Sequence, residues 1–424
     1  MNKVLIVTYY WPPSGGAGVQ RWLKFSKYLP EFGWDPIILT IDPHYAAYPV
    51  TDFSLKDDLS QSLKVYSTPA INYFGIYRKD ISKIPAAGFA NSVDNSLKGK
   101  ILRFMRGNFF LPDPRRGWNK FAFKKACELI ESEGIRNIIT TSPPHSTQLI
   151  GLKIKKKYPM IRWIADLRDP WTDIYYYKQF YPTLISKWID RRYEKNVLKR
   201  ADKIITVGAS LKNLFSLKAK DIENKTVVIT NGYDKDDFSG IVAINPPLFT
   251  ITYVGTLSDI YPVDGLLDAI NIFKEKGNNL KIRFIGTVSQ YQKDLIQLKT
   301  GDSNLEFITY VDHSSAIKFM LDTTVLLLII PDHQSNKSII TGKLFEYMAS
   351  GKPIICLGPT DGDAADIIRD TGHGETFSYV DSHGISEYLL SLITDNTILE
   401  KVSPEVFSRM ELTRKIIPLL SIQN

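Results

Sequence analysis

The sequence predicts an α/β protein in which two parallel-sheet domains follow one another along the chain. With 424 residues, the chain is longer than one hydrophobic core usually organises. Short apolar runs typical of buried strands alternate with helical patterns in both halves, as they do in parallel sheets with helices on both faces. A polar stretch at 234–247, which ends in two prolines, interrupts this alternation and is typical of a linker. We therefore expect two Rossmann-like domains, at 1–240 and 241–404, with their strand ends facing each other across a cleft.

The N-terminal half begins with a complete βαβ pattern. A strand at 4–9 leads into a glycine loop at 15–18 and a helix whose apolar residues recur at the helical period, and a strand at 36–40 closes the unit. The remaining strand candidates of this half lie at 137–140, 162–165, 203–207 and 227–229.

The C-terminal half repeats the pattern, and one of its helices carries a lysine and a glutamate near its start. Its strand candidates lie at 249–254, 282–285, 305–308, 324–330 and 354–357. The segment 341–353 is then the helix between the last two strands. Lys343 and Glu346 are three residues apart in its first turns and share a face, where parallel sheets bind phosphates and nucleotides. A capping box is the alternative for Glu346, but Thr341 is followed at that spacing by Leu344.

The composition indicates a globular protein of a reducing compartment. The apolar fraction is 44%, and the two cysteines, Cys127 and Cys356, lie in a helical pattern and in a strand pattern, where neither is placed for a disulfide. The N-terminus lacks the pattern of a secretory signal, and the apolar run at 325–330 is too short to span a bilayer. We expect a cytoplasmic protein, and a location at the inner face of the membrane is compatible with the sequence.

The net charge of +8 is concentrated in part in the segment 103–125. There, arginines and lysines alternate with large apolar residues such as Phe109 and Trp118. This mixture suits a peripheral contact with acidic lipid headgroups, and it equally suits helices whose aromatic side chains lie in the core. No signature of a nucleic-acid-binding module is present, so we expect no nucleic-acid partner.

Two loops of the N-terminal half carry candidate phosphate- or sugar-binding residues. Gly15, Gly16 and Gly18 allow backbone amides to approach a ligand at a helix N-terminus. A nicotinamide dinucleotide is disfavoured, because the third glycine of that fingerprint falls on Arg21. His145 follows the strand at 137–140, where it can orient a substrate hydroxyl, donate to a phosphate, or serve as a solvated or capping residue.

The next strand is followed by a second polar group. Asp166, Arg168 and Asp169 come directly after 162–165 and are candidates to bind an acceptor or a phosphate. The alternation of a strand sends Asp166 and Arg168 to one side. A structural ion pair between Arg168 and Asp169 is the alternative.

In the C-terminal half, the loop after the strand at 249–254 is a candidate diphosphate site. The amides of Gly255 and Thr256 can meet a diphosphate there, and Asp366 lies one turn into a helix after the strand at 354–357. Asp-x-Asp pairs occur at 234/236 and 361/363. Because no histidines cluster with them, we expect no metal site.

With these patterns together, the chain resembles retaining glycosyltransferases of the GT-B fold, and within them the family 4 group that builds bacterial surface polysaccharides. The resemblance extends nearly end to end. It is most specific in four segments, which are 4–18, Asn231-Gly232-Tyr233-Asp234, Tyr253-Val254-Gly255-Thr256, and 341–353 with its Lys343-Leu344-Phe345-Glu346 start.

The resemblance implies a role for several residues. Glu346 matches the glutamate that binds the donor ribose, and residues at the helix start, including Leu344, hold the diphosphate. Lys343 is placed to neutralise the leaving group. The family uses no metal and no cofactor beyond the nucleotide sugar, which we expect to be UDP- or GDP-linked. A helix at 405–424 is implied to return to the first domain.

The chain departs from the family at three places. Ser338 stands where many members have a first glutamate, and Thr256 stands where many have an arginine. Val263 or Asp264 occupies the region where many have a lysine. These departures shift phosphate binding to Lys343, Arg168 and Lys337. We therefore expect Lys343, Arg168 and His145 to be the catalytic residues and Ser338 to lie in the donor site.

The expected function is transfer of a hexosyl group from a nucleotide-diphosphate sugar to a lipid-linked or glycan acceptor in cell-surface polysaccharide synthesis. Two alternatives remain open. One is a sugar-nucleotide epimerase of similar fold, and the other is a degenerate transferase that acts as a non-catalytic binding subunit.

Overall fold

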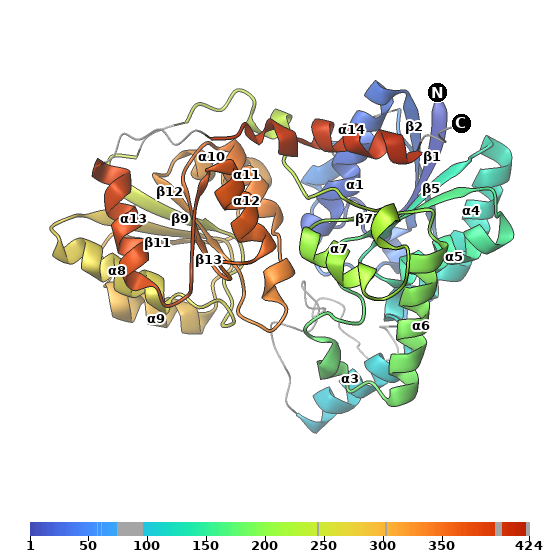
Figure 1. The fold of residues 1–424 in the computed structure, drawn as a ribbon, viewed down its shortest axis with the longest axis horizontal. Coiled ribbons are helices and arrows are strands. Elements are labelled where there is room, and N and C mark those ends of the chain that lie inside the picture. The colour runs from blue at the N-terminus through green and yellow to red at the C-terminus, as the bar shows by residue number, and fades with distance from the viewer. Residues whose placement is uncertain are drawn as a thin grey trace. The chain divides into compact units, whose positions relative to one another are not determined.

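The computed structural model describes residues 1–56, 58–60, 62–73, 96–243, 246–301, 303–394 and 401–420, and it divides the chain into two compact units. The first unit comprises Met1–Thr230 and Arg409–Asn424, and the second comprises Asn231–Ser408 (Figure 1). Each unit contains its own parallel sheet covered by helices, which confirms the predicted fold class.

The sheet of the first unit has the strand order β3-β2-β1-β5-β6-β7-β8, and all neighbouring strands are parallel. The strands are β1 (Asn2–Val7), β2 (Trp34–Ile41), β3 (Lys64–Thr68), β5 (Asn137–Ser142), β6 (Arg162–Leu167), β7 (Lys203–Thr206) and β8 (Thr226–Val228). The order reverses between β1 and β5. Loops that follow these two strands therefore meet at the switch point of the sheet.

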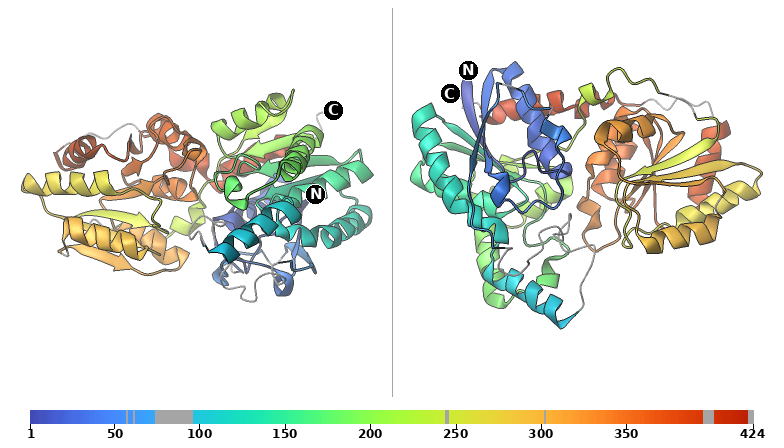
Figure 2. Two further views of the ribbon diagram at one scale, coloured as in Figure 1. Left: turned by 90° about the horizontal axis from the view of Figure 1, so that it is seen from below. Right: turned by 180° about the vertical axis from the view of Figure 1, so that it is seen from behind.

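Two apolar cores lie on the two faces of this sheet. Alternate residues of β1 point to opposite faces, so Leu5 packs in one core while Val4 packs in the other. The first core is covered by α4 (Asn119–Glu133), α5 (Ser146–Lys157), α6 (Leu184–Arg200) and α7 (Ala209–Ser216). The second is covered by α1 (Ala17–Tyr28) and α14 (Arg409–Leu420). A further helix, α3 (Leu97–Phe109), extends away from the sheet beside one end of α6 (Figure 2, right).

The sheet of the second unit has the order β11-β10-β9-β12-β13-β14 and is also parallel throughout. The strands are β9 (Phe249–Val254), β10 (Leu280–Ile285), β11 (Leu305–Ile308), β12 (Val325–Ile329), β13 (Ile354–Leu357) and β14 (Gly374–Phe377). The order reverses between β9 and β12. Carboxyl ends of β9 and β12 thus define the position where sheets of this kind bind ligands.

Within the described residues, six α-helices cover the faces of the second sheet. One face carries α8 (Asp264–Glu275), α9 (Gln290–Thr300) and α13 (Ser382–Thr394). The other carries α10 (His313–Leu321), α11 (Gly342–Ala349) and α12 (Asp363–Thr371). The segment 341–353 therefore supplies helix α11 between β12 and β13, as the βαβ pattern predicts.

The polar stretch at 234–247 begins inside the second unit. Asp234 is buried, and its side chain accepts a hydrogen bond from the Asp236 amide at 3.2 Å, which caps the short 3-10 helix Lys235–Phe238. The first Asp-x-Asp pair is thus a local cap. Both cysteines, Cys127 and Cys356, are free and buried.

Candidate active site

Helix α11 begins at the switch point of the second sheet, and a buried tyrosine fixes it there. The Tyr347 hydroxyl is inaccessible to solvent and accepts a hydrogen bond from the Val254 amide at 3.1 Å. Because Val254 is the last residue of β9, this bond ties α11 to the carboxyl end of the strand. The N-terminus of α11, with its exposed amides and positive dipole end, therefore lies where an anion binds most favourably.

Lys343 reaches back from the first turn of α11 to the end of β9. Its Nζ donates to the Tyr253 hydroxyl at 3.2 Å and lies 4.4 Å from the centroid of the Tyr253 ring. It also lies against Gly255, where a Cβ atom would be only 2.8 Å from Nζ and where the backbone φ is 131°. Position 255 must therefore be glycine for the lysine to occupy this place. The Tyr253 hydroxyl in turn donates to the Thr256 carbonyl at 2.7 Å.

The ammonium group of Lys343 has lost more solvation than its acidic neighbour Glu346 compensates for. Burial lowers the pKa of Lys343 from 10.5 to about 8, and the charge of Glu346 opposes this shift only in part. Its hydrogen-bonding partner Tyr253 is neutral, and burial raises the pKa of that hydroxyl well above its usual value. A bound anion would restore the lost solvation of the ammonium group, so this position is suited to a phosphate.

Glu346 lies one turn after Lys343 and is held by a histidine. Its Oε1 is 3.0 Å from His313 Nε2, and His313 Nδ1 is 3.9 Å from the carboxylate of Asp237. His313 is the first residue of α10, and the Asp312 carboxylate caps this helix by accepting from the Ser315 amide at 2.9 Å. His313 was not predicted as a site residue. The signal that could have found it was its place at the start of the helix that follows the predicted strand at 305–308, at the same edge of the sheet.

The other predicted donor residues lie in different environments. Thr256 is exposed beside Gly255, whereas the side chain of Leu344 is buried in the core and offers only its backbone. The Ser338 hydroxyl donates to the Ser335 carbonyl at 3.2 Å, and Asp366 pairs with Arg369 at 2.6 Å on the surface.

Lys337, which was expected to help bind phosphate, already has an acidic partner. It forms an ion pair with Asp361, and both side chains are exposed. The structure therefore brings Gly255, Thr256, Lys343 and Glu346 to one edge, while Lys337 is already neutralised.

In the first unit, Arg168 connects loops at the switch point between β1 and β5. Its Nε donates to the Ser142 carbonyl at 3.0 Å, and a guanidinium nitrogen donates to the Gly18 carbonyl at 3.2 Å. The glycine loop reaches the same place, because Gly16 is the N-cap residue of α1. Gly15 donates instead to the Val50 carbonyl at 2.9 Å. Within the described residues, Arg168 makes no ion pair with Asp169.

Asp166 lies beneath this edge and has no access to a ligand. It is completely buried, and its carboxylate accepts from Arg21 at 3.2 Å, from the Trp22 indole at 2.7 Å and from the Thr141 hydroxyl at 2.8 Å. Arg21 also donates to the Ile229 carbonyl at 2.8 Å. Arg21, which stands where a dinucleotide fingerprint has its third glycine, is therefore a buried cation that connects α1 to the sheet.

His145 is a neutral residue in this structure. Its ring stacks on Trp171 with centroids 5.0 Å apart and planes 11° from parallel. Burial lowers the pKa of His145 to about 4, so its imidazole is uncharged near pH 7. In this state it can exchange a hydrogen bond with a hydroxyl, and it carries no charge of its own to attract a phosphate. Burial also raises the pKa of Asp169.

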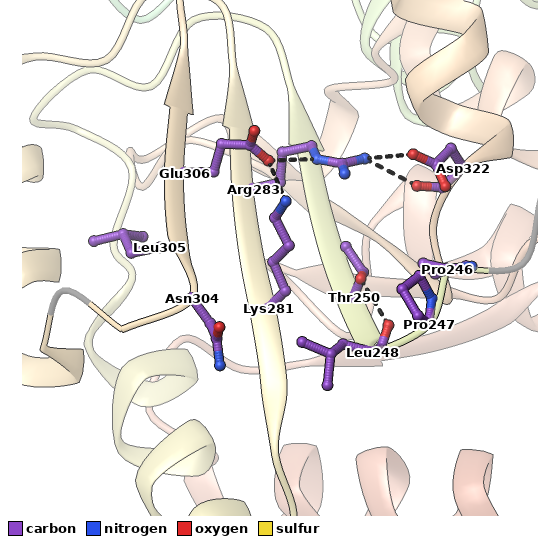
Figure 3. Close-up of a pocket in the computed structure, with 10 residues that line it drawn as sticks. All are labelled: Pro246, Pro247, Leu248, Thr250, Lys281, Arg283, Asn304, Leu305, Glu306 and Asp322. Atoms are coloured by element: carbon purple, nitrogen blue, oxygen red, sulfur yellow. Dashed lines mark hydrogen bonds and ion pairs between the residues drawn. The ribbon is translucent and has the colours of Figure 1, made fainter.

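A pocket of about 420 Å³ lies at the opposite, amino-terminal edge of the second sheet (Figure 3). Lys281 and Arg283 both pair with Glu306 there, at 2.7 and 2.9 Å, and Arg283 also pairs with Asp322 at 3.2 Å. The charges that line this pocket are therefore paired with one another, in contrast to that of Lys343.

Among the residues that the structure describes, no three His, Cys, Asp or Glu side chains are grouped so that they could hold a metal ion. In the same part of the chain, no helix has both the length and the apolar character to cross a bilayer.

Comparison with known proteins bears on both units. Residues 234–407 match the family model of glycosyl transferases group 1, and this match lies within the second unit. No curated protein matches the sequence significantly.

Solved structures with the same fold cover nearly the whole chain. Sucrose-phosphate synthase from Thermosynechococcus elongatus is 14% identical with a TM-score of 0.61, over 99% of this chain and 98% of that one. The Anabaena protein HepE in complex with UDP is 12% identical with a TM-score of 0.61, over 99% of each chain. A putative UDP-N-acetylglucosamine 2-epimerase from Listeria monocytogenes is 9% identical with a TM-score of 0.54, over 98% of this chain and 94% of that one. These likenesses show the GT-B fold, and together with the family match they support a glycosyltransferase.

Proposed function

We propose that the protein is a metal-independent, retaining glycosyltransferase of the family 4 type that moves a hexosyl group from a UDP- or GDP-linked sugar to an acceptor. One observation carries the proposal. The partly buried ammonium group of Lys343 lies at the carboxyl end of β9, one helical turn from Glu346, inside the segment that matches glycosyl transferases group 1. A lysine with a pKa of about 8 and a neutral hydrogen-bonding partner is suited to the charge that appears on a diphosphate leaving group.

In this proposal, one group of donor-site residues binds the diphosphate of the nucleotide and another binds its ribose. Lys343, the α11 N-terminus and the Thr256 amide bind the diphosphate and stabilise it as the glycosidic bond breaks, whereas the Gly255 and Leu257 amides already donate to the Ile285 and Thr287 carbonyls. Glu346, held by His313, accepts hydrogen bonds from the ribose hydroxyls. In a retaining transfer of this type, the acceptor hydroxyl enters on the face that the leaving group departs from, and the leaving phosphate takes its proton. No nucleophile from the protein is required.

The first unit supplies the acceptor-binding residues in this proposal. Neutral His145 orients a substrate hydroxyl, while Arg168 and the glycine loop at 16–18 offer a cation and backbone amides to a phosphate. A saccharide linked to a lipid diphosphate, as used in cell-surface polysaccharide synthesis, presents both groups. We therefore propose a lipid-linked or glycan acceptor and a place of work at the cytoplasmic face of the membrane.

The test is thermal stabilisation of the purified chain by a panel of nucleoside diphosphates. At a hundredfold excess over Kd, UDP or GDP should raise the melting temperature of the second unit by about 5–10 °C. The shift should be lost in Glu346→Gln and retained in the exposed control Glu275→Gln. If every nucleotide leaves the melting temperature unchanged, the proposal is wrong.

An epimerase is the second candidate, because the Listeria monocytogenes structure shares the fold. NMR of a nucleotide sugar incubated with the protein alone separates the two activities. An epimerase converts the sugar without an acceptor, whereas a transferase releases the nucleotide only when an acceptor is present. A non-catalytic subunit would bind the nucleotide and show neither reaction, even with native lipid acceptor.

A further inference from the structure

We propose that α3 and the first turns of α6 form a surface that docks on an anionic lipid bilayer. We call it the α3–α6 tip. Its apolar side chains are between 41% and 83% exposed, and they are Leu97, Ile101, Phe104 and Phe109 of α3 and Leu184, Ile185 and Trp188 of α6. Soluble surfaces carry single exposed apolar residues, but a group of this size on two adjoining helices indicates a binding face. This inference rests on the membrane location in the proposed function, while the surface itself is argued from the exposure and charge of these residues.

The tip differs from the segment 103–125 that the sequence suggested for a membrane contact. Much of that segment faces inward, since Arg103, Leu111 and Trp118 are buried. Phe104 and Phe109 are its exposed aromatic residues. The apolar surface extends instead to the start of α6, about 75 residues further along the chain.

Helix α3 is amphipathic with its apolar face turned outward. Leu97, Ile101 and Phe104 recur at the spacing i, i+4, i+7 and form one exposed stripe. The opposite face, which meets the protein, consists of Gly99, Arg103 and Gly107. A helix that only had to cover the protein would place its apolar stripe inward, so this orientation requires another apolar partner.

A side-chain amide joins α3 to the start of α6. Asn108 Nδ2 donates to the Tyr181 carbonyl at 3.1 Å, and its Oδ1 accepts from the Thr183 amide and the Ser186 hydroxyl, each at 2.8 Å. Thr183 is the N-cap residue of α6. The two apolar groups therefore belong to one connected structure, which extends beyond the sheet of its unit (Figure 1).

Among the described residues of α3 and α6, the exposed charges have one sign. Helix α3 contains no acidic residue, and its Lys98 and Lys100 are exposed. The two acidic residues of α6 are buried: Asp190 accepts from the Tyr177 hydroxyl at 2.9 Å, and Glu194 accepts from the Thr172 hydroxyl at 2.7 Å. The exposed face of α6 is therefore positive, through Arg191, Arg192 and Lys195.

The order of these residues along α6 matches the layers of a membrane interface. Leu184, Ile185 and Trp188 occupy the first turns, and Lys195 follows roughly 16 Å along the axis at about 1.5 Å per residue. The guanidinium of Arg192 lies 5.3 Å from the centroid of the Trp188 ring. With the apolar end in the acyl boundary, the basic residues reach the headgroups, where each contributes about 1 kcal/mol of attraction to anionic lipid.

The same charges argue against a second copy of the chain as the partner. A two-fold contact would place this positive surface against itself. Like charges in such a contact repel, whereas acidic headgroups neutralise them.

The experiment is co-sedimentation of the full chain with vesicles of phosphatidylcholine alone or with 30% phosphatidylglycerol. We expect binding to the anionic vesicles, at least tenfold weaker binding to the neutral ones, and release by 0.5 M NaCl. The triple variant Leu184→Ser, Ile185→Ser, Trp188→Ser and the charge variant Arg191→Glu, Arg192→Glu should each reduce binding at least tenfold. The control Leu217→Ser, Leu298→Ser changes two apolar residues that are equally exposed elsewhere and should bind like the unaltered chain.

Two further measurements separate the outcomes. Circular dichroism and the UDP-induced melting shift, measured on the same samples, should be unchanged in the tip variants, because their side chains are exposed and lie outside the second unit. Equal binding by the tip variants and the unaltered chain would overturn the proposal, as would absence of binding to anionic vesicles. Self-association in sedimentation velocity that the triple variant abolishes, without vesicle binding, would assign the tip to a second copy instead.

Discussion

Lys343 is the residue whose environment says most about ligand binding, because its pKa is already lowered in the ligand-free protein. Its pKa is lowered from 10.5 to about 8 by burial. A bound diphosphate favours the charged form and raises the pKa again, so binding and protonation are linked.

This linkage predicts how UDP affinity depends on pH. Below about pH 8, Lys343 is already protonated and the affinity is at its full value. As the pH rises through 8, binding must take up a proton, and the affinity should fall by up to about tenfold per pH unit. Isothermal titration calorimetry between pH 7.5 and 10 measures this slope. Lys343→Arg keeps its charge over the whole range and should show no slope, whereas equal slopes in both proteins would exclude Lys343 as the titrating group.

Several of the candidate site residues were predictable from spacing, and others were not. Lys343 and Glu346 share a helical face by their separation alone. His313 was missed because its contact with Glu346 depends on how α10 packs beside α11, which no local pattern records. Asp166 was expected in a loop site, but it is buried because Arg21, 145 residues away in sequence, reaches it through the core.

At the scale of elements, strands that contain an apolar run were predicted, and strands that lack one were not. The continuous apolar run of β12 predicted a buried central strand, and the structure places it there. Two of the four edge strands in the described residues, β3 and β14, were missed because neither contains an apolar run, whereas the edge strands β8 and β11 do contain one and were predicted. An edge strand is defined by the neighbour it pairs with, and its own sequence carries little of that information.

Helix α3 provides an element-scale prediction at its contact with the 3-10 helix Tyr177–Phe180. A Cβ atom at Gly107 would lie 2.3 Å from the Phe180 carbonyl oxygen, so Gly107→Ala must separate the two elements. We expect a cost of roughly 1–3 kcal/mol and faster amide hydrogen exchange across 97–109. Lys100→Ala, at an exposed position of the same helix, should leave the exchange unaltered. If Gly107→Ala exchanges like the unaltered chain, the contact does not hold α3 in place.

At the scale of the whole molecule, the first unit is assembled from two separate parts of the chain. Leu412, Ile416 and Leu420 of α14 are buried in the same core as Trp22 and Val19 of α1. The first unit therefore depends on a helix that follows the entire second unit in sequence.

This arrangement predicts which unit a substitution in α14 affects. Ile416→Ala should destabilise the first unit by about 2–5 kcal/mol, because the fully buried side chain leaves a cavity. Differential scanning calorimetry should show a lower transition for the first unit, while the UDP-responsive transition of the second unit stays in place. The matched control is Ile393→Ala in α13, whose side chain is about half exposed and should shift neither transition by more than about 1 °C. A shift of both transitions together would mean that the units do not unfold separately.

The late position of α14 also has a consequence for biosynthesis. On the ribosome, residues up to Thr230 emerge first, but the apolar face of α1 stays uncovered until Arg409–Leu420 has been made. At roughly 5–20 residues per second, this interval lasts on the order of ten to forty seconds. During this interval, the apolar side chains on that face of α1 lack their partners in α14. The first unit can complete its core only after the second unit has been translated, so a chain truncated before Arg409 lacks part of that core.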